Sequence, residues 1–195
     1  ISYVHTPVRY AWDQMNTYLK RSFLSRIGLG PLIRWQLHAL RQWDQLSSSR
    51  VDYLLANSTF TAKRIWKYWR RHSEVLYPPV NINRFEWEKP REDFYLSVCR
   101  LVPNKRVDLV VRAFNKLKLP LVVVGDGVEK AYLKDLAGPT VQILGFQSKE
   151  KIEKLMSRCR AFVYAGIEDF GIAPVEAMAS GAPVIAFAKG GVLDT

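Results

Sequence analysis

Two carboxylates, Glu168 and Glu176, stand eight positions apart in a stretch that also holds Phe170, Gly171 and Pro174. Ionised carboxylates accept hydrogen bonds, so this pair suits the recognition of sugar or ribose hydroxyls, with the amides around Phe170 and Gly171 as added donors. Two carboxylates could also form an acid–base pair for glycoside hydrolysis. A purely structural alternative is a glutamate near a helix N-terminus and an exposed loop glutamate.

Two cations, Arg100 and Lys105, follow a predicted strand and precede a predicted helix. Cationic side chains and the positive end of a helix together favour a bound diphosphate. A solvated basic loop is the alternative explanation. The two cations alone do not decide between these explanations. Together with the residues at the other strand ends they indicate an anion site.

Glycines follow the next two predicted strands. Gly125 and Gly127 flank Asp126, which could cap the following helix, and Gly145 precedes Phe146, which could line a flat base. Plain turns explain both segments without a ligand. The sequence contains no G-x-G-x-x-G fingerprint and no P-loop, which disfavours a dehydrogenase or an ATPase.

The elements that must position these residues form a regular series from residue 93 onward. Single helices between strands require the strands to lie parallel, which predicts a Rossmann-like, doubly wound parallel sheet of the α/β class. Ligands of such sheets bind at the carboxyl ends of the strands, where the candidate residues stand. The predicted strands are 94–99, 120–124, 141–144, 160–164 and 183–187, and the predicted helices are 106–118, 127–137, 148–158 and 173–180.

The first part of the chain follows a different pattern. Helical spacing of apolar residues covers 10–22 and 31–48, a strand is predicted at 51–56, a cap at Asn57-Ser58, a helix at 59–71 and a strand at 74–77. We expect residues 1–77 to form part of one domain, 78–92 to form a linker, and 93–195 to form a second, truncated domain. Both ends of the chain are abrupt, so we expect a piece of a longer protein.

Positive charge is concentrated in residues 1–77, which hold 12 Lys/Arg and 4 Asp/Glu and so carry +8 of the whole chain's net charge of +11. Five of the six tryptophans also lie there. Cations interleaved with aromatics suit an anionic surface, and we prefer a phospholipid surface to nucleic acid. The sequence shows no membrane-spanning run, no signal peptide and no metal-binding cysteine motif, which favours a cytoplasmic protein with reduced thiols.

Taken in order, Arg100 with Lys105, the Gly125–Gly127 and Gly145–Phe146 turns, the glutamate pair and Gly190-Gly191 resemble retaining glycosyltransferases of family 4, a GT-B group. The spacing of Glu168 and Glu176 matches the E-x7-E motif of that family. This resemblance covers residues 75–195. A weaker one covers residues 3–13, which resemble the segment that carries the family's active-site histidine, here His5, and Asn57-Ser58, which precede the crossing between domains.

The resemblance implies the C-terminal half of a GT-B fold, preceded by part of its N-terminal Rossmann-like domain. Arg100 and Lys105 would hold the diphosphate, Glu168 the transferred sugar and Glu176 the ribose. His5 would contact the sugar or its leaving group from the acceptor-side domain, unless it is an ordinary core or surface histidine. Further contacts to the nucleotide sugar would come from Gly125, Asp126, Gly145, Phe146, Phe170, Gly171 and Ile172. Neither a metal nor a cofactor is expected, and transfer would retain the anomeric configuration.

Residues 5–13 and 100–108 look most like mannosyltransferases that build surface polysaccharides, so GDP-mannose is the first expected donor and a UDP-sugar the second. The acceptor would be a glycan or a lipid-linked sugar, which fits a peripheral position on the cytoplasmic face of a membrane. The family's glycine-rich first loop and its last helix are not in this sequence, so we expect these 195 residues to bind donor weakly and to have little activity. A nucleic-acid-binding module and a non-catalytic scaffold remain the alternatives.

Overall fold

The computed structural model describes residues 1–16, 19 and 28–195, and it divides the chain into two compact units. The first comprises Ile1–Tyr77 with Asp194, and the second Pro78–Leu193 with Thr195. Of the helix predicted at residues 10–22, residues 17, 18 and 20–22 lie outside the described residues, and residues 15, 16 and 19 are helical. The described start of that segment was predicted wrongly, because residues 9–13 form turns.

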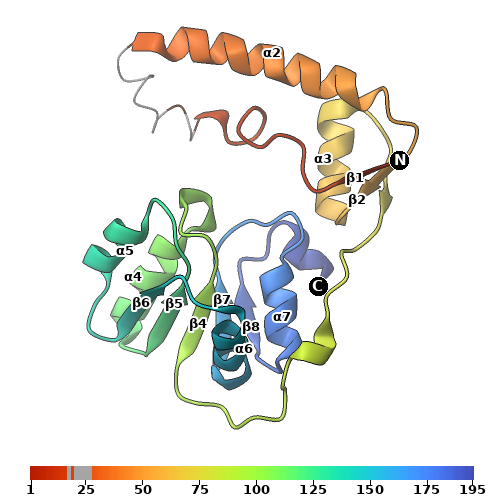
Figure 1. Ribbon diagram of the computed structural model, residues 1–195. Coiled ribbons are helices and arrows are strands. Elements are labelled where there is room, and N and C mark those ends of the chain that lie inside the picture. Colours follow the sequence, from red (N-terminus) through yellow and green to blue (C-terminus); the bar gives the residue numbers. More distant parts are fainter. Residues whose placement is uncertain (17–18, 20–27) are drawn as a thin grey trace. The chain divides into compact units, whose positions relative to one another are not determined.

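The second unit contains a five-stranded parallel sheet, as predicted (Figure 1). Each predicted strand and helix is present, with its ends shifted by at most three residues. The strands are β4 (Tyr95–Val98), β5 (Leu121–Val124), β6 (Val141–Gly145), β7 (Ala161–Tyr164) and β8 (Val184–Ala186), and the helices are α4 (Val107–Leu117), α5 (Lys130–Leu136), α6 (Lys149–Arg158) and α7 (Ile172–Ala179). Short 3-10 helices are η2 (Ile82–Arg84), η3 (Pro103–Lys105) and η4 (Gly191–Asp194), of which only the last residue of η4 is outside this unit.

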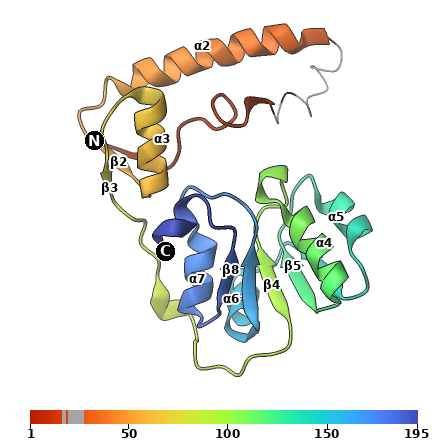
Figure 2. The same ribbon diagram turned by 180° about the vertical axis from the view of Figure 1, so that it is seen from behind.

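Helices cover both faces of this sheet (Figure 2). The α4 residues Val107, Val110, Val111 and Phe114 recur with helical spacing, and they pack with Leu133 of α5 against one face. On the other face, α6 and α7 pack on strand residues that include Leu96 and Phe162. The sheet is therefore buried on both sides, which is the condition for a parallel sheet.

The strand order is β6-β5-β4-β7-β8, which places β4 next to β7 although β5 and β6 lie between them in the sequence. Helix α4 leaves β4 toward one face and α7 leaves β7 toward the other, so the order reverses at this pair. Register pairs join only Tyr95 with Ala161 and Leu96 with Phe162, the first halves of both strands. A switch point of this kind opens a crevice at the carboxyl ends of the strands.

The first unit contains a smaller parallel sheet of order β1-β2-β3, formed by β1 (Ser2–Val4), β2 (Leu54–Ala56) and β3 (Glu74–Val75). Its helices are α2 (Gly30–Ser48) and α3 (Thr59–Trp69), both close to their predicted bounds. Ser58 caps α3, since its hydroxyl accepts a hydrogen bond from the Thr61 N–H at 2.9 Å. The strand predicted at 51–56 begins later, at Leu54, and the Val51 carbonyl before it accepts a hydrogen bond from the Arg71 guanidinium at 2.7 Å.

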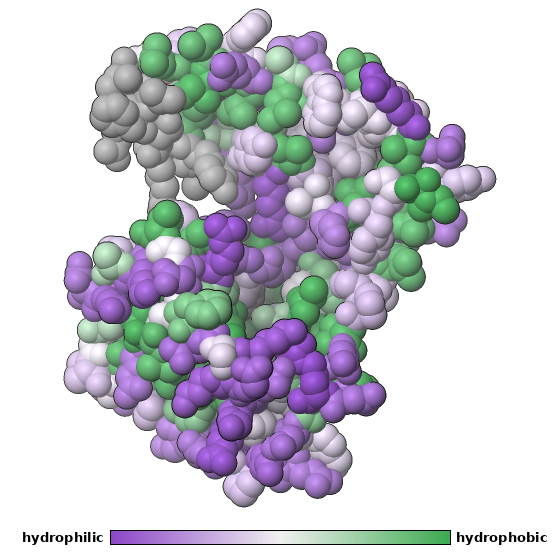
Figure 3. Space-filling view, in the orientation of Figure 1, coloured by the Kyte–Doolittle hydropathy of each residue, from purple (hydrophilic) through white to green (hydrophobic). Residues whose placement is uncertain are grey.

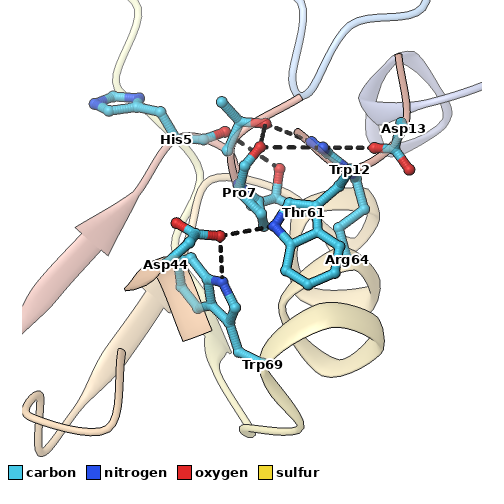
Figure 4. Close-up of polar contacts among 9 residues, drawn as sticks. His5, Pro7, Trp12, Asp13, Asp44, Thr61, Arg64 and Trp69 are labelled. Carbon is cyan, nitrogen blue, oxygen red and sulfur yellow. Dashed lines mark hydrogen bonds and ion pairs between the residues drawn. The ribbon is translucent and has the colours of Figure 1, made fainter. Parts of the chain in front are cut away.

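Polar contacts hold the segment after β1 against α2 and α3 (Figure 4). The buried Asp44 carboxylate accepts hydrogen bonds from the indole N–H groups of Trp12 and Trp69, each at 2.8 Å. Arg64 of α3 pairs with Asp13 at 2.6 Å and donates to the Pro7 carbonyl at 3.1 Å. These bonds explain why residues 9–13 turn back onto the unit instead of continuing a helix.

Candidate functional site

Three polar side chains meet where β4 and β7 end. Lys105 belongs to η3 after β4, Tyr164 is the last residue of β7, and Glu168 lies on the loop after β7. The Lys105 ammonium and the Tyr164 hydroxyl both donate to Oε1 of Glu168. The side chains of Lys105 and Glu168 are 17% and 22% exposed, so the ion pair is partly shielded from water and remains reachable. This Lys105–Glu168–Tyr164 cluster lies at the switch point of the sheet.

The backbones beneath this cluster approach each other closely. A Cβ atom on Gly166 would lie 3.0 Å from Cα of Lys105, so only glycine fits without a shift. The Glu168 carbonyl is fixed from the other side, because it accepts a hydrogen bond from the Gly191 N–H at 2.9 Å. Glycine at residue 166 thus allows the loops after β4 and β7 to place Lys105 against Glu168.

Arg100 follows β4 as predicted, but its side chain takes no part in the cluster. It is exposed and makes no ion pair with any residue that the structure describes. Lys105 is therefore an oriented cation, whereas the Arg100 guanidinium is a solvated one. A bound anion would contact the Lys105 ammonium where it already lies, and the Arg100 guanidinium would have to turn toward it.

The loops after β4, β5 and β6 are joined at Gly125. Its N–H donates to the Gly145 carbonyl at 2.9 Å, and a Cβ atom on it would lie 1.8 Å from the Cys99 carbonyl oxygen, with φ +143°. Phe146, immediately after this junction, is 78% exposed. Its ring is therefore free for contact with a flat partner.

Asp126 does not cap α5, and that prediction was wrong. Helix α5 begins at Lys130 with Glu129 as its N-cap residue. The exposed Asp126 carboxylate instead accepts the Gly127 N–H at 2.8 Å and pairs with the Lys130 ammonium at 2.7 Å. Its contacts stabilise the turn after β5.

The N-terminus of α7 follows the Glu168 loop directly. Gly171 is its N-cap residue, and as a glycine it has no side chain to cap the first turn. The neighbouring Phe170 ring is buried and Ile172 is about half exposed. The peptide N–H groups at this helix start are thus the part of the predicted Phe170–Ile172 site that suits an anion or a hydroxyl.

Glu176 has surroundings of its own. Its carboxylate lies 3.7 Å from the Arg84 guanidinium, which also bonds Glu153 of α6 at 2.7 Å. Burial raises the pKa of Glu176, the charges of Arg84 and Lys149 oppose the rise, and Glu153 adds to it. The ion pair with Arg84 therefore ties Glu176 to a residue outside the Lys105–Glu168–Tyr164 cluster.

Cys99 lies below the cluster as a neutral thiol. Burial raises its pKa to about 12, while the nearby Lys105 lowers the pKa and Glu168 raises it. Both cysteines are free, and the described residues contain no group of His, Cys, Asp or Glu side chains that could hold a metal ion. The polar chemistry of this edge therefore rests on Lys105, Glu168 and Tyr164.

His5 belongs to the first unit, at the end of β1. Its exposed ring meets Tyr3 edge to face, with centroids 5.2 Å apart. Its carbonyl accepts hydrogen bonds from Asn57 at 3.1 Å and Thr61 at 3.4 Å, whereas the ring points away from these contacts (Figure 4). The backbone of His5 is thus fixed and its imidazole is available.

Sequence reasoning missed Tyr164 and Arg84. Tyr164 reads as one more apolar residue of a buried strand, and only its position as the last strand residue marks it. Arg84 lies in the predicted linker at 78–92, where no motif singles it out. The sequence feature that could have pointed to Arg84 is its position as a cation shortly before the first strand of the sheet.

Comparisons with known proteins identify the family. The family model for glycosyl transferases group 1 matches residues 80–195. Over 214 residues the chain is 27% identical to the human alpha-1,3/1,6-mannosyltransferase ALG2, covering 89% of this chain and 49% of that protein. It is 29% identical over 198 residues to the GDP-Man:Man(3)GlcNAc(2)-PP-Dol alpha-1,2-mannosyltransferase of Candida glabrata, covering 87% and 39%.

A comparison with solved structures shows the fold. The crystal structure of Anabaena Alr3699/HepE in complex with UDP and glucose superposes with a TM-score of 0.72 at 20% identity, covering 98% of this chain and 53% of that one. This likeness shows a GT-B fold. The chain spans 32% to 49% of the length of the curated relatives it matches. Because the family model covers more than half of its residues, the chain belongs to the glycosyl transferases group 1 family.

Proposed function

We propose that this chain is part of an enzyme that transfers a hexose from a nucleotide sugar to a glycan or a lipid-linked acceptor. The observation that carries the proposal is the Lys105–Glu168–Tyr164 cluster at the switch point of a sheet that belongs to a glycosyltransferase family. Ligands of such sheets bind at this place.

Lys105 and Arg100 are proposed to bind the diphosphate, with the N–H groups at the start of α7. During transfer the bond from the sugar C1 to the diphosphate oxygen breaks, and the acceptor oxygen forms the new bond to C1. The acceptor proton passes to the departing phosphate. Negative charge grows on the diphosphate, so cations held beside it lower the barrier.

Glu168 and Glu176 are proposed to bind hydroxyls of the sugar and of the ribose, and neither acts as a nucleophile. Glu168 is oriented by Tyr164, and Glu176 by Arg84. The exposed Phe146 and the backbone at Gly125, Asp126 and Gly145 would contact the base. Retention of the anomeric configuration is part of the proposal.

Mannose from GDP-mannose is the proposed donor. Two relatives named as mannosyltransferases support it, and the name of one of them includes GDP-Man. We assign residues 1–77 to the acceptor-side domain, 78–92 to the linker and 93–195 to the donor domain, with His5 as the residue that contacts the sugar or its leaving group. A lipid-linked acceptor would place the enzyme peripherally on the cytoplasmic face of a membrane.

Calorimetric titration of the chain with GDP, GDP-mannose, UDP and UDP-glucose tests this proposal. We expect saturable binding of GDP and GDP-mannose, and loss of that binding in Glu176→Ala. Saturable binding of UDP ligands alone would assign the donor to the UDP class. Binding of oligonucleotides with steep salt dependence, and of no nucleotide sugar, would contradict the transferase assignment.

A further inference from the structure

A groove of about 530 Å³ lies between the last turns of α2 and the end of α3, within the first unit. Pockets for small ligands occupy about 300–1,000 Å³, so its size suits one. Trp69 and Arg71 line the groove from the α3 side. One face of α2 lines it as well, with residues at steps of three or four: Gln42, Gln45, Leu46 and Ser49.

The surface of α2 is mixed in character. Hydrophobic and hydrophilic residues lie side by side over this helix (Figure 3). None of the helices that the structure describes is long and apolar enough to cross a membrane. Polar and apolar groups of α2 are thus both available to a ligand in the groove.

The Trp69 ring and the Arg71 guanidinium are held in place. The Trp69 indole N–H donates to the buried Asp44 carboxylate at 2.8 Å, which fixes the orientation of the ring (Figure 4). The Arg71 guanidinium donates at 2.6, 2.7 and 3.2 Å to three main-chain carbonyls, those of Ser48, Val51 and Asp52. A guanidinium has five N–H groups, so these bonds leave donors for a ligand. Groups that are already oriented lose little freedom when a ligand binds.

The α2 side of the groove offers both donors and acceptors. Gln42 and Gln45 are exposed, and each amide has an N–H₂ donor and a carbonyl acceptor. The Ser49 hydroxyl donates to the Leu46 carbonyl at 2.6 Å, so its oxygen serves a ligand as an acceptor. Among the described residues that line the groove there is no Asp or Glu, which disfavours a cationic ligand.

We propose that this groove binds a short stretch of a glycan. Sugar hydroxyls both donate and accept hydrogen bonds, which matches the amides of Gln42 and Gln45 and the remaining N–H groups of Arg71. The C–H face of a hexose is apolar, and it packs on the fixed ring of Trp69. A purely apolar ligand would leave the amides and the guanidinium unmatched.

This inference goes beyond the proposed function, because it names a binding site for sugars that do not react. None of the residues proposed to bind the nucleotide sugar lines the groove. The inference rests on the proposed function only in the choice of a mannose oligosaccharide as the first probe. Its test contains no nucleotide, so the groove can bind sugar when the titration with GDP fails, and the reverse.

Proton–nitrogen correlation NMR of the 195-residue chain tests the inference, with the Trp69 indole N–H as reporter. The variant Trp69→Phe identifies this signal. We expect mannotriose to shift the Trp69 signal in a saturable manner, because a sugar ring packs on the indole. The signal of the exposed Trp87, in the second unit, should stay in place. A saturable shift with maltotriose as well would support a groove that accepts hexoses in general.

Changing both Gln42 and Gln45 to Ala should weaken mannotriose binding by about tenfold or more, because two hydrogen-bonding amides are lost. Both side chains are exposed and alanine favours a helix, so the fold should be kept. Gln36→Ala is the matched control, since Gln36 is an exposed amide of α2 that does not line the groove. Its binding should stay within about twofold of that of the unchanged chain.

Three results would overturn the inference. The first is a Trp69 signal that neither mannotriose nor maltotriose shifts. The second is equal binding in the double variant and in Gln36→Ala. The third is saturation of the Trp69 shift by inorganic phosphate but by neither trisaccharide, which would show an anion site at Arg71 instead.

Discussion

Replacing Lys105 by Met isolates the charge of the proposed diphosphate site. Methionine keeps an apolar stem of similar reach and removes the ammonium group that Glu168 orients. A hydrogen bond to a charged group contributes about 1.5–3 kcal/mol. At about 1.4 kcal/mol for each factor of ten, GDP should bind about 10- to 150-fold more weakly.

The same substitution should affect the fold only modestly. Glu168 keeps its hydrogen bond from Tyr164, and its side chain is 22% exposed, so water replaces part of the lost partner. We expect a loss of about 1–2 kcal/mol of unfolding free energy, below the 3–5 kcal/mol typical of a broken, fully buried pair. Thermal melting followed by circular dichroism measures this loss.

Calorimetry with GDP and with guanosine tests whether Lys105 binds the diphosphate. Guanosine lacks the phosphates, so its affinity should not change in Lys105→Met, whereas that of GDP should fall. Lys116→Met is the control, since this exposed lysine at the end of α4 carries the same charge. Equal weakening of GDP and guanosine would refute the assignment of Lys105 to the diphosphate, and so would unchanged binding of GDP.

Three further variants test other parts of the structure. Glu176→Gln should weaken GDP binding. It should also raise the melting temperature relative to the unchanged chain, by more as pH rises above 4.5. Burial raises the pKa of Glu176 in the folded chain, so the unchanged chain loses unfolding free energy as pH rises from 4.5 through the folded pKa, whereas the glutamine variant stays neutral. A melting difference that does not grow with pH would contradict this. Gly125→Ala should cost more than about 3 kcal/mol in denaturant unfolding, because its Cβ would overlap the Cys99 carbonyl at positive φ; a cost below 1 kcal/mol would show that the turn can shift. Asp44→Ala should destabilise the first unit by about 2–4 kcal/mol, since two indole N–H groups lose their acceptor, whereas exposed Asp52→Ala should change stability by less than about 0.5 kcal/mol.

The layered fold was predictable from local patterns. The run Leu121–Val124 is apolar without alternation, as in a strand buried on both faces, and α4 shows apolar residues at helical spacing. Single helices between such strands leave a parallel sheet as the only compact arrangement. The predicted positions of Lys105 and Glu168 at strand ends follow from the same series.

The pairing of Lys105 with Glu168 was not predictable from the sequence. It depends on β4 and β7 being neighbours, and that depends on the faces to which α4 and α7 turn. The apolar spacing of a helix tells which of its sides is buried, but not which face of the sheet it covers. Arg84 was missed for a similar reason, because its contact with Glu176 joins a residue before β4 to a helix that lies far along the chain.

The positions of the tryptophans, two of which share the acceptor Asp44, decide what intrinsic fluorescence can report. Trp12 and Trp69 have their indole N–H groups on one buried carboxylate, and five of the six tryptophans belong to the first unit. Intrinsic fluorescence will therefore report mainly on Ile1–Tyr77, while the second unit contributes only the exposed Trp87. An emission-based melting curve can thus stay unchanged when a nucleotide stabilises Pro78–Leu193, whereas circular dichroism at the same temperatures records both units.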